Sequence, residues 1–206
     1  MTETEKMMRG MMYDPFTEEM PDMRKRAHDL CREFNKLSEN DPRRQTILDE
    51  LIPENHGVYL QGPIQFDYGC LTTFGEHCYA NFNFTVLDDC PITIGNNVFI
   101  GPNVSLVTAV HPLLPSERNQ FLRADGAWSD LEYAKPIVIE DDCWIASGVT
   151  VCGGVTIGRG SVIGAGSVVT HDIPPHSLAY GVPCRAVREI TSADSVKARK
   201  DLWPEK

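Results

Sequence analysis

A six-residue period runs through most of the chain and limits the folds that it can adopt. From Ile139 onward the sequence divides into the hexads IEDDCW, IASGVT, VCGGVT, IGRGSV, IGAGSV and VTHDIP, and each opens on an aliphatic residue. The fifth position is small or β-branched, and glycine and polar residues fill the middle. Neither an α-helix nor a simple hairpin repeats every six residues. A short strand with a tight turn does, so three hexads predict one triangular turn of a parallel β-helix.

The same period occurs earlier in the chain and is then interrupted. Eight hexads hold phase from Ile64 to His111, but Leu106 and Ile139, which open hexads on either side of the break, lie 33 residues apart. Since 33 is not a multiple of six, the intervening segment must leave the coil as an excursion loop, at about 112–135. The histidine of TAVHP is the last residue before this exit. It is either an ordinary exposed loop residue or a catalytic group that a rigid scaffold holds beneath a long loop.

Composition excludes several classes of function. The chain has 206 residues, 42% of them hydrophobic, which suits one main body with small appendages. A formal net charge of −10 without a basic stripe argues against general nucleic-acid binding. The seven cysteines and six histidines lack metal-site spacing, so no metal is expected. No apolar run approaches the roughly 18 residues of a membrane span, and we expect a cytoplasmic protein without membrane contact.

Two helices are predicted before the coil. Residues 21–38 carry apolar residues at helical spacing, and Asp41 and Pro42 then open a second helix with an N-cap and a first-turn proline. The apolar face of the second helix consists of Ile47, Leu48, Leu51 and Ile52. Such a helical hairpin is expected to cap the open end of the coil, which otherwise exposes strand edges. His28 and the lysines and arginines around it are assigned to a solvated face.

Four longer stretches carry more specific information than the hexads. They are YANFNFTVLDD from Tyr79, IGPNVSLVTAVHP from Ile100, EYAKPIVIEDDCWIASGVTV from Glu132 and IGAGSVVTHDIPPHSLAYGVPCRAVREI from Ile163. In this order, within residues 7–190, they resemble the maltose/galactoside O-acetyltransferases, a branch of the hexapeptide-repeat acyltransferases. The resemblance implies an all-β main body, a left-handed parallel β-helix at 59–190, and an N-terminal helical cap at 1–58. The tail at 191–206 departs from the family.

The resemblance also implies an activity and an assembly. It implies an acetyl-CoA-dependent O-acetyltransferase that moves an acetyl group to a hydroxyl, the 6-hydroxyl, of a sugar such as maltose, glucose or a galactoside, with acetyl-CoA as co-substrate and no metal. It implies a homotrimer with active sites between subunits. A surplus of aromatic residues expected on edges or in the loop is consistent with that: Phe82, Phe84, Phe99, Phe121 and Trp128. Two alternatives stay open, namely a different small acceptor such as an antibiotic or amino sugar, and a noncatalytic scaffold.

By the same resemblance, His111 is the catalytic base and Asn81 is the amide that positions the acceptor and steadies the transition state. A histidine suits proton removal from an alcohol near neutral pH. Glu132 either orients the base or binds the acceptor, and Asp14 is displaced by one place from the family's position. The carboxylates assigned to the acceptor's hydroxyl groups are Asp14, Asp67, Asp89 and Glu132. Asn83 and Asn96 are interpreted as turn residues with positive φ.

The donor is assigned to the later hexads. By resemblance, Trp144 and Ser147 line the pantetheine channel, and a groove for CoA continues through Ala165, Thr170 and His171. Two arginines in CRAVRE, Arg185 and Arg188, are assigned to the CoA phosphates, because an acidic chain needs local cations to hold an anionic ligand. The cysteines occupy small or hidden hexad positions, so direct transfer is favoured over a cysteine acetyl-enzyme.

Overall fold

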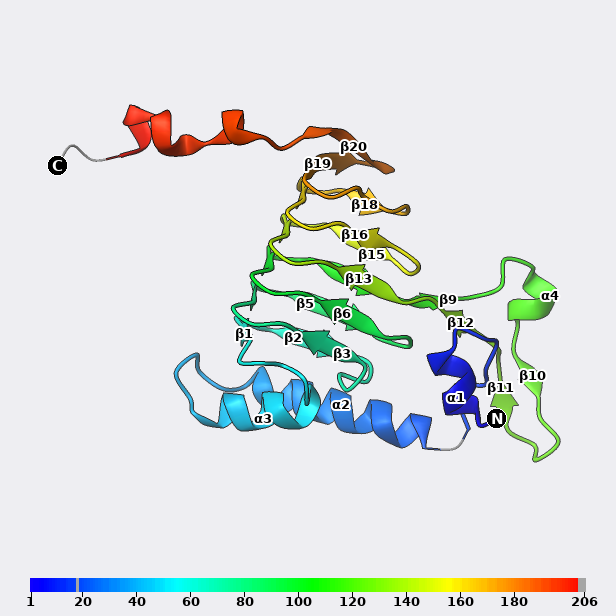
Figure 1. Cartoon of the computed structure of the whole chain (residues 1–206). Coiled ribbons are helices and arrows are strands. Elements are labelled where there is room, and N and C mark those ends of the chain that lie inside the picture. Colours follow the sequence, from blue (N-terminus) through cyan, green and yellow to red (C-terminus); the bar gives the residue numbers. More distant parts are fainter. Residues whose placement is uncertain (18, 204–206) are drawn as a thin grey trace.

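The computed structural model describes residues 1–17 and 19–203, and in them three parallel sheets wind into one coil (Figure 1). The first face consists of β1 (Tyr59–Leu60), β4 (Tyr79–Ala80), β7 (Phe99–Ile100), β14 (Trp144–Ile145), β17 (Val162–Ile163) and β19 (Ser177–Gly181). The second face consists of β2 (Ile64–Phe66), β5 (Phe84–Leu87), β8 (Ser105–Val107), β15 (Thr150–Cys152) and β18 (Val168–Val169). The third face consists of β3 (Thr72–Phe74), β6 (Ile92–Ile94), β13 (Ile137–Ile139) and β16 (Thr156–Ile157).

The chain visits these faces in strict rotation, which confirms the predicted parallel β-helix. A strand of the first face leads to the second face, then to the third, and then to the first face one layer higher. We call the turns between first and second face the first corner, and the turns between second and third face the second corner. Paired residues lie one above another, so residues at one corner stack.

The prediction that the hexads hold phase from Ile64 is wrong, because the lower layers repeat every 20 residues, as in Tyr59, Tyr79 and Phe99, whereas Trp144 and Val162 are 18 apart. The two extra residues lie at the second corner, where Val86 to Ile94 spans eight positions and the equivalent Val151 to Ile157 spans six.

The interior explains the hexad pattern. Side chains alternate along a strand, so the fifth position and the first position of the next hexad both point inward while the residue between them points outward. Cys143 and Ile145 are buried, whereas Trp144 between them is exposed. Phe84, predicted at an edge, is instead fully buried, because it occupies an inward position and meets the rings of Phe66 and Phe74.

The fourth hexad position turns the corners with positive φ. Gly148, Gly154, Gly160 and Gly166 have this conformation at intervals of six. Asn83 has it too, as predicted, because asparagine tolerates the left-handed region. The prediction for Asn96 is wrong, since the left-handed residue is its neighbour Asn97. The Asn96 side chain instead accepts the Glu76 N–H from the adjacent layer at 2.8 Å.

Helices α2 (Met20–Phe34) and α3 (Arg43–Leu51) close the bottom of the coil (Figure 1). Helix α1 (Glu3–Met8) lies to one side, against residues 133–134. Buried residues of α2 and α3 join the same hydrophobic cluster as the coil interior, so the hairpin covers the strand edges as expected. The start of α3 differs slightly from the prediction: Pro42 stands at the N-cap position, and the Asp41 carboxylate accepts the Arg43 N–H at 3.0 Å.

The excursion loop leaves and re-enters the coil at the second corner. It contains β9 (Ala109–Val110), α4 (Pro115–Arg118), β10 (Phe121–Leu122), β11 (Trp128–Ser129) and β12 (Tyr133–Ala134). Strands β9 and β12 pair antiparallel, and the Lys135 N–H donates to the Thr108 carbonyl at 3.0 Å, so exit and return lie side by side. Tyr13 forms a further antiparallel bridge with Glu132, which brings the N-terminal segment beside the loop (Figure 1).

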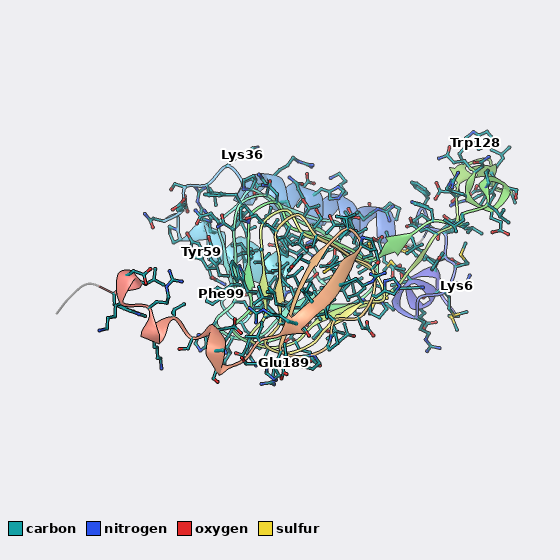
Figure 2. The ribbon with its side chains drawn as sticks, turned by 90° about the horizontal axis from the view of Figure 1, so that it is seen from above. Lys6, Lys36, Tyr59, Phe99, Trp128 and Glu189 are labelled. Atoms are coloured by element: carbon teal, nitrogen blue, oxygen red, sulfur yellow. The ribbon has the colours of Figure 1, made fainter. Side chains whose placement is uncertain are left out.

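At the top, β19 turns back into β20 (Cys184–Glu189), an antiparallel edge strand. The tail continues in short 3-10 turns at Ser192–Asp194, Val196–Ala198 and Lys200–Leu202, while 204–206 lie outside the described residues. Seen from above, the loop around Trp128 and the tail project from opposite sides of the coil (Figure 2). Within the described residues, no helix has the length and apolarity to cross a bilayer.

Candidate active site

Acidic side chains gather at the second corner, where the coil interior would otherwise stay apolar. Asp67 follows β2, Asp88 and Asp89 follow β5, and Glu132 immediately precedes β12. His111 follows β9, directly across the β9–β12 ribbon from Glu132. The corner therefore brings His111, Glu132 and Asp89 together, although they come from segments far apart in the sequence.

A chain of polar contacts links these residues to Tyr13. The Tyr13 hydroxyl lies 2.7 Å from Glu132 Oε1 and 3.1 Å from Asp89 Oδ1. The other oxygen of Glu132, Oε2, lies 3.6 Å from His111 Nε2. Tyr13 is fully buried, whereas the His111 side chain is 52% exposed. An imidazole that faces solvent with a carboxylate behind it is suited to take a proton from a bound hydroxyl, since the carboxylate stabilises the imidazolium.

The two neighbouring aspartates differ in how their oxygens are satisfied. Asp88 accepts from the Tyr68 N–H at 2.8 Å and from the Thr72 hydroxyl at 3.0 Å, so it joins layers of the coil. Asp89 is also buried, but its Oδ2 has no hydrogen-bond partner among the described residues. Burial, together with the nearby carboxylates of Glu132 and Asp67, raises the pKa of Asp89 to about 7. A buried acceptor without a partner is suited to receive a ligand hydroxyl.

Burial also raises the pKa of Glu132, while the Tyr13 hydrogen bond and the charge of His111 oppose that rise. For Tyr13, burial and the two adjacent carboxylates raise the pKa far above its ordinary value. Its hydroxyl therefore stays protonated and acts as a hydrogen-bond donor at neutral pH.

Helix α2 supplies two residues to this corner that the sequence analysis placed on a solvated face. His28 Nε2 lies 3.2 Å from Asp67 Oδ1. Arg24 donates to the Tyr68 hydroxyl at 2.6 Å and to the Pro15 carbonyl at 2.7 Å. The prediction is wrong for these two residues, because their side of α2 faces the second corner, whereas Lys25, Arg26 and Arg32 are exposed as predicted. The spacing of Arg24 and His28 was the available signal that they act together, because residues four apart lie on one face of a helix.

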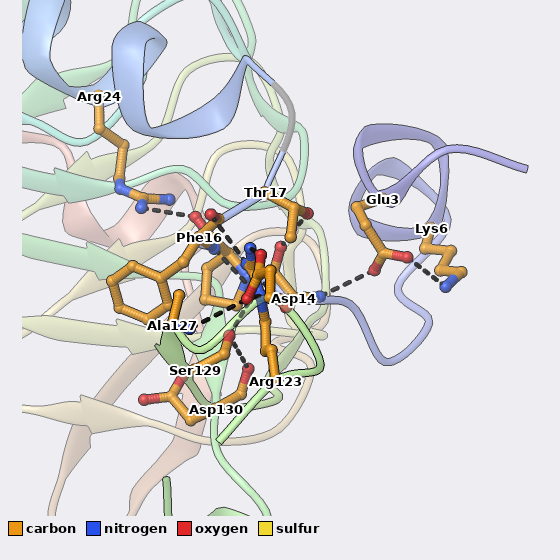
Figure 3. A network of polar contacts seen from close by, with 12 residues as sticks. Glu3, Lys6, Asp14, Phe16, Thr17, Arg24, Arg123, Ala127, Ser129 and Asp130 are labelled. Atoms are coloured by element: carbon orange, nitrogen blue, oxygen red, sulfur yellow. Dashed lines mark hydrogen bonds and ion pairs between the residues drawn. The ribbon is translucent and has the colours of Figure 1, made fainter. Parts of the chain in front are cut away.

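Asp14 is not brought into the cluster. Its Oδ1 accepts from the Ser129 hydroxyl at 2.5 Å and from the Phe16 N–H at 2.9 Å, and its Oδ2 lies 3.5 Å from Arg123 Nη1 (Figure 3). These contacts tie the N-terminal segment to the excursion loop. Neighbouring side chains of an extended segment point to opposite sides, and the side chain of Tyr13 is the one that reaches the cluster.

The remaining predicted residues divide between the two corners. Asn81 follows β4, Ser147 follows β14 and Ala165 follows β17, which places all three at the first corner. Trp144 is exposed on the first face beside them. Thr170 and His171 follow β18 at the second corner, where the Thr170 hydroxyl lies 2.9 Å from His171 Nδ1. The width of the second face thus separates Asn81 from His111, and one chain does not bring them together.

Comparisons with known proteins agree with this architecture. Residues 6–54 match the maltose acetyltransferase hexapeptide capping motif, residues 91–110 the hexapeptide repeat of succinyl-transferase, and residues 136–171 the bacterial transferase hexapeptide. The galactoside O-acetyltransferase of Escherichia coli K12 is 40% identical over 200 residues, covering 96% of this chain and 94% of its own. The chain belongs to the hexapeptide-repeat acetyltransferases.

Solved structures place it in the same family. A maltose O-acetyltransferase from Clostridium difficile 630 superposes with a TM-score of 0.84 at 40% identity, covering 93% of this chain and 99% of that one. A galactoside acetyltransferase in complex with coenzyme A superposes with a TM-score of 0.82 at 39% identity, covering 94% of each chain.

In this hexapeptide-repeat acetyltransferase the two predicted phosphate ligands already have partners. Arg188 forms a two-pronged ion pair with the Asp194 carboxylate, at 2.6 and 2.8 Å. Arg185 donates to the carbonyl of Cys184 at 2.7 Å. Asp194 belongs to the tail, for which the sequence analysis made no structural prediction. The Asp194 carboxylate therefore competes with a phosphate for the Arg188 guanidinium.

Proposed function

We propose that this protein is an acetyl-CoA-dependent sugar O-acetyltransferase, with the 6-hydroxyl of maltose, glucose or a galactoside as the acceptor group. The single observation that carries the proposal is the half-exposed His111 imidazole at the second corner, backed by the Glu132 carboxylate at 3.6 Å. The relatives named for transfer to maltose and galactosides support a sugar acceptor. Unpaired carboxylate oxygen on Asp89 suits a molecule rich in hydroxyl donors.

In the proposed reaction the sugar hydroxyl attacks the thioester carbonyl while His111 takes its proton. The new C–O bond gives a tetrahedral oxyanion, which collapses as the C–S bond breaks. The proton on His111 then passes to the departing CoA sulfur. Glu132 stabilises the imidazolium, and the Asn81 amide donates to developing negative charge. No covalent acetyl-enzyme is needed, and burial raises the pKa of the Cys90 and Cys143 thiols to about 11, which disfavours their thiolates.

We further propose a homotrimer whose active sites lie between subunits. The second corner of one subunit supplies His111 and Glu132, and the first corner of the next supplies Asn81. Support comes from an exposed aromatic column on the first face, where Tyr59, Tyr79, Phe99 and Trp144 stand in register (Figure 2 labels Tyr59 and Phe99). Tyr59, Phe99 and Trp144 are about half exposed in the single chain, and contiguous apolar surface of this kind marks an interface.

The same arrangement accounts for the division of the donor residues. Trp144, Ser147 and Ala165 would line the pantetheine channel from one subunit, and Thr170 and His171 would do so from its neighbour. Arg185 and Arg188, on the edge strand β20, are proposed to bind the CoA phosphates.

A thiol-release assay tests the activity. The protein is given acetyl-CoA with monosaccharides, disaccharides, amino sugars and a hydroxylated antibiotic in turn, and NMR of the product locates the acetyl group. Turnover with maltose, glucose or a galactoside and acetylation at the 6-hydroxyl is expected. Turnover confined to an antibiotic or an amino sugar would assign the other acceptor class, and no turnover with any acceptor would contradict transferase function.

Co-expression of two inactive variants tests the shared site. His111→Ala and Asn81→Ala should each be inactive alone. A mixed trimer contains a cleft in which the intact His111 of one subunit meets the intact Asn81 of the next, so co-expression should restore turnover. If both residues acted within one chain, no mixture of the two variants would be active.

A further inference from the structure

The Tyr13 side chain contacts both Asp89 and Glu132, two carboxylates of the proposed acceptor site. It reaches them from the N-terminal segment, which is separated from Asp89 by 76 positions and from Glu132 by 119. Its backbone is held as well, because its N–H donates to the Glu132 carbonyl at 2.9 Å and its carbonyl accepts the Glu132 N–H at 3.2 Å. The ring is fully buried beside Tyr68, Met7 and Met20. Both backbone and side chain therefore fix Tyr13 relative to Glu132.

The single proton of the Tyr13 hydroxyl decides which of the two carboxylates accepts its hydrogen bond. A phenol has one O–H, so it donates to only one of the two carboxylates. The 2.7 Å distance to Glu132 Oε1 is shorter than the 3.1 Å distance to Asp89 Oδ1, which makes Glu132 the acceptor. The phenol oxygen can then accept from Asp89 when that carboxyl carries a proton. Asp89 is the group whose pKa burial brings to about 7, so it holds a proton through much of the neutral range.

We propose that Tyr13 is a positioning residue for the transfer reaction: its hydroxyl donates to Glu132 and accepts from the Asp89 carboxyl, which fixes the Glu132 carboxylate against His111. This inference rests on the proposed function, because it assigns Tyr13 to the base of that reaction. Without the hydroxyl, Glu132 would be free to turn away from the imidazole. Tyr13 acts through Glu132 and touches neither substrate.

The charges around Glu132 set the expected pH dependence. Tyr13 faces Glu132 from the N-terminal segment, and Asp89 faces it from the coil. His111 and Asp130 face Glu132 from the excursion loop, and Arg24 faces it from α2. The Tyr13 hydrogen bond stabilises the charged form and so lowers the Glu132 pKa against the effect of burial. Removing the hydroxyl must therefore raise that pKa. Activity that requires ionised Glu132 will then be lost at a higher pH on acidification.

The first test is the variant Tyr13→Phe, which keeps the buried ring and deletes the hydroxyl. We expect kcat/KM for the sugar to fall at least about tenfold, as for a lost hydrogen bond to a charged group, with the KM for acetyl-CoA unchanged. The acid limb of the pH profile should move to higher pH. Tyr68→Phe is the matched control, since the Tyr68 hydroxyl is buried in the same cluster but bonds to Arg24. Its acid limb should stay at the wild-type position.

A double-mutant cycle separates positioning from general destabilisation. If Tyr13 acts through Glu132, adding Tyr13→Phe to Glu132→Gln should change kcat/KM by less than about threefold, because the carboxylate that it positions is already gone. Fully additive losses, or equal shifts of the acid limb in Tyr13→Phe and Tyr68→Phe, would overturn the inference.

An infrared measurement tests the contact without relying on turnover. Below pH 7 the wild-type protein should show a protonated-carboxyl C=O band that is absent from Asp89→Asn. In Tyr13→Phe this band should shift, because the Asp89 carboxyl loses its partner. An unshifted band would refute the Asp89–Tyr13 contact. A shifted band in a protein that acetylates nothing would uphold the contact but remove both the proposed function and the catalytic role of Tyr13.

Discussion

The first and second corners of the coil are built from the same hexads but carry different chemistry. At the first corner the layers meet through small residues: a Cβ added to Gly101 would lie 2.7 Å from the Ser147 amide nitrogen. At the second corner Asp88 joins the layers, and Asp67, Asp89, Glu132 and His111 gather beside it. The close backbone packing at the first corner suits the narrow arm that carries a thioester. The acidic side chains at the second corner suit the hydroxyl groups of an acceptor. The core uses only the inward hexad positions, so each corner is free to carry its own function.

The largest expected effect comes from His111→Ala at the second corner. General-base help is worth roughly 10²–10⁴-fold, so kcat should fall by about that factor while acetyl-CoA binding and assembly persist. Steady-state kinetics measures kcat and the KM for acetyl-CoA, and sedimentation measures assembly. His77→Asn is a control at a different corner, since His77 has positive φ, which asparagine tolerates, and should keep full activity. Full activity in His111→Ala would remove the imidazole from the mechanism.

The buried carboxyl of the second corner should make stability depend on pH. The folded pKa of Asp89, about 7, lies above the unfolded value of about 4, so the native state binds this proton more tightly. Its unfavourable contribution is absent below about pH 4, grows as pH rises, and is complete above pH 7. Asp89→Asn should therefore stabilise the fold at pH 8, on the order of 1–3 kcal/mol, and much less at pH 4. Urea unfolding at both pH values provides the measurement, and an equal effect at each would contradict the buried-charge explanation.

Replacing both Arg185 and Arg188 with alanine tests the donor side. The KM for acetyl-CoA should rise at least about tenfold and the KM for the sugar should change little, because the donor alone carries phosphates. This rise in the KM for acetyl-CoA should become smaller at higher salt concentration, because salt screens the charges. Unchanged donor affinity at low ionic strength would make these arginines ordinary surface charges.

The smallest expected effect concerns the tail. Asp194 pairs with Arg188 on the exposed edge of the coil, and an exposed ion pair contributes little free energy because water and salt screen it. Asp194→Asn should therefore lower the KM for acetyl-CoA by at most about fivefold, by releasing Arg188. Asp201→Asn is a matched control, since Asp201 pairs with Arg199 within the tail. An increase in KM on Asp194→Asn would instead show that the ion pair holds Arg188 ready for the phosphate.

The sequence could predict what the period determines, and little beyond it. The coil and its inward positions above Ile139 follow from counting in sixes, whereas the two extra residues of each lower turn and the exit at Thr108 do not. Tyr13 was not identified because it lies outside the periodic region, 76 and 119 positions from its partners Asp89 and Glu132. His28 was misassigned because a helical pattern does not say what lies opposite its polar face. Phe84 was placed at an edge by residue type, although its side chain points inward from β5.

The paired exit and return of the excursion have an evolutionary consequence. The chain leaves at Thr108 and comes back at Lys135, whose backbones are joined at 3.0 Å, so the coil continues as though nothing intervened. Residues can be inserted into or deleted from the loop without changing the phase of any later hexad. An insertion of one residue within a strand of the coil would instead reverse the inward and outward sides of the rest of that strand, because side chains alternate. Mutations in loop length can thus reshape the surface beside His111 while the coil above it is inherited unaltered.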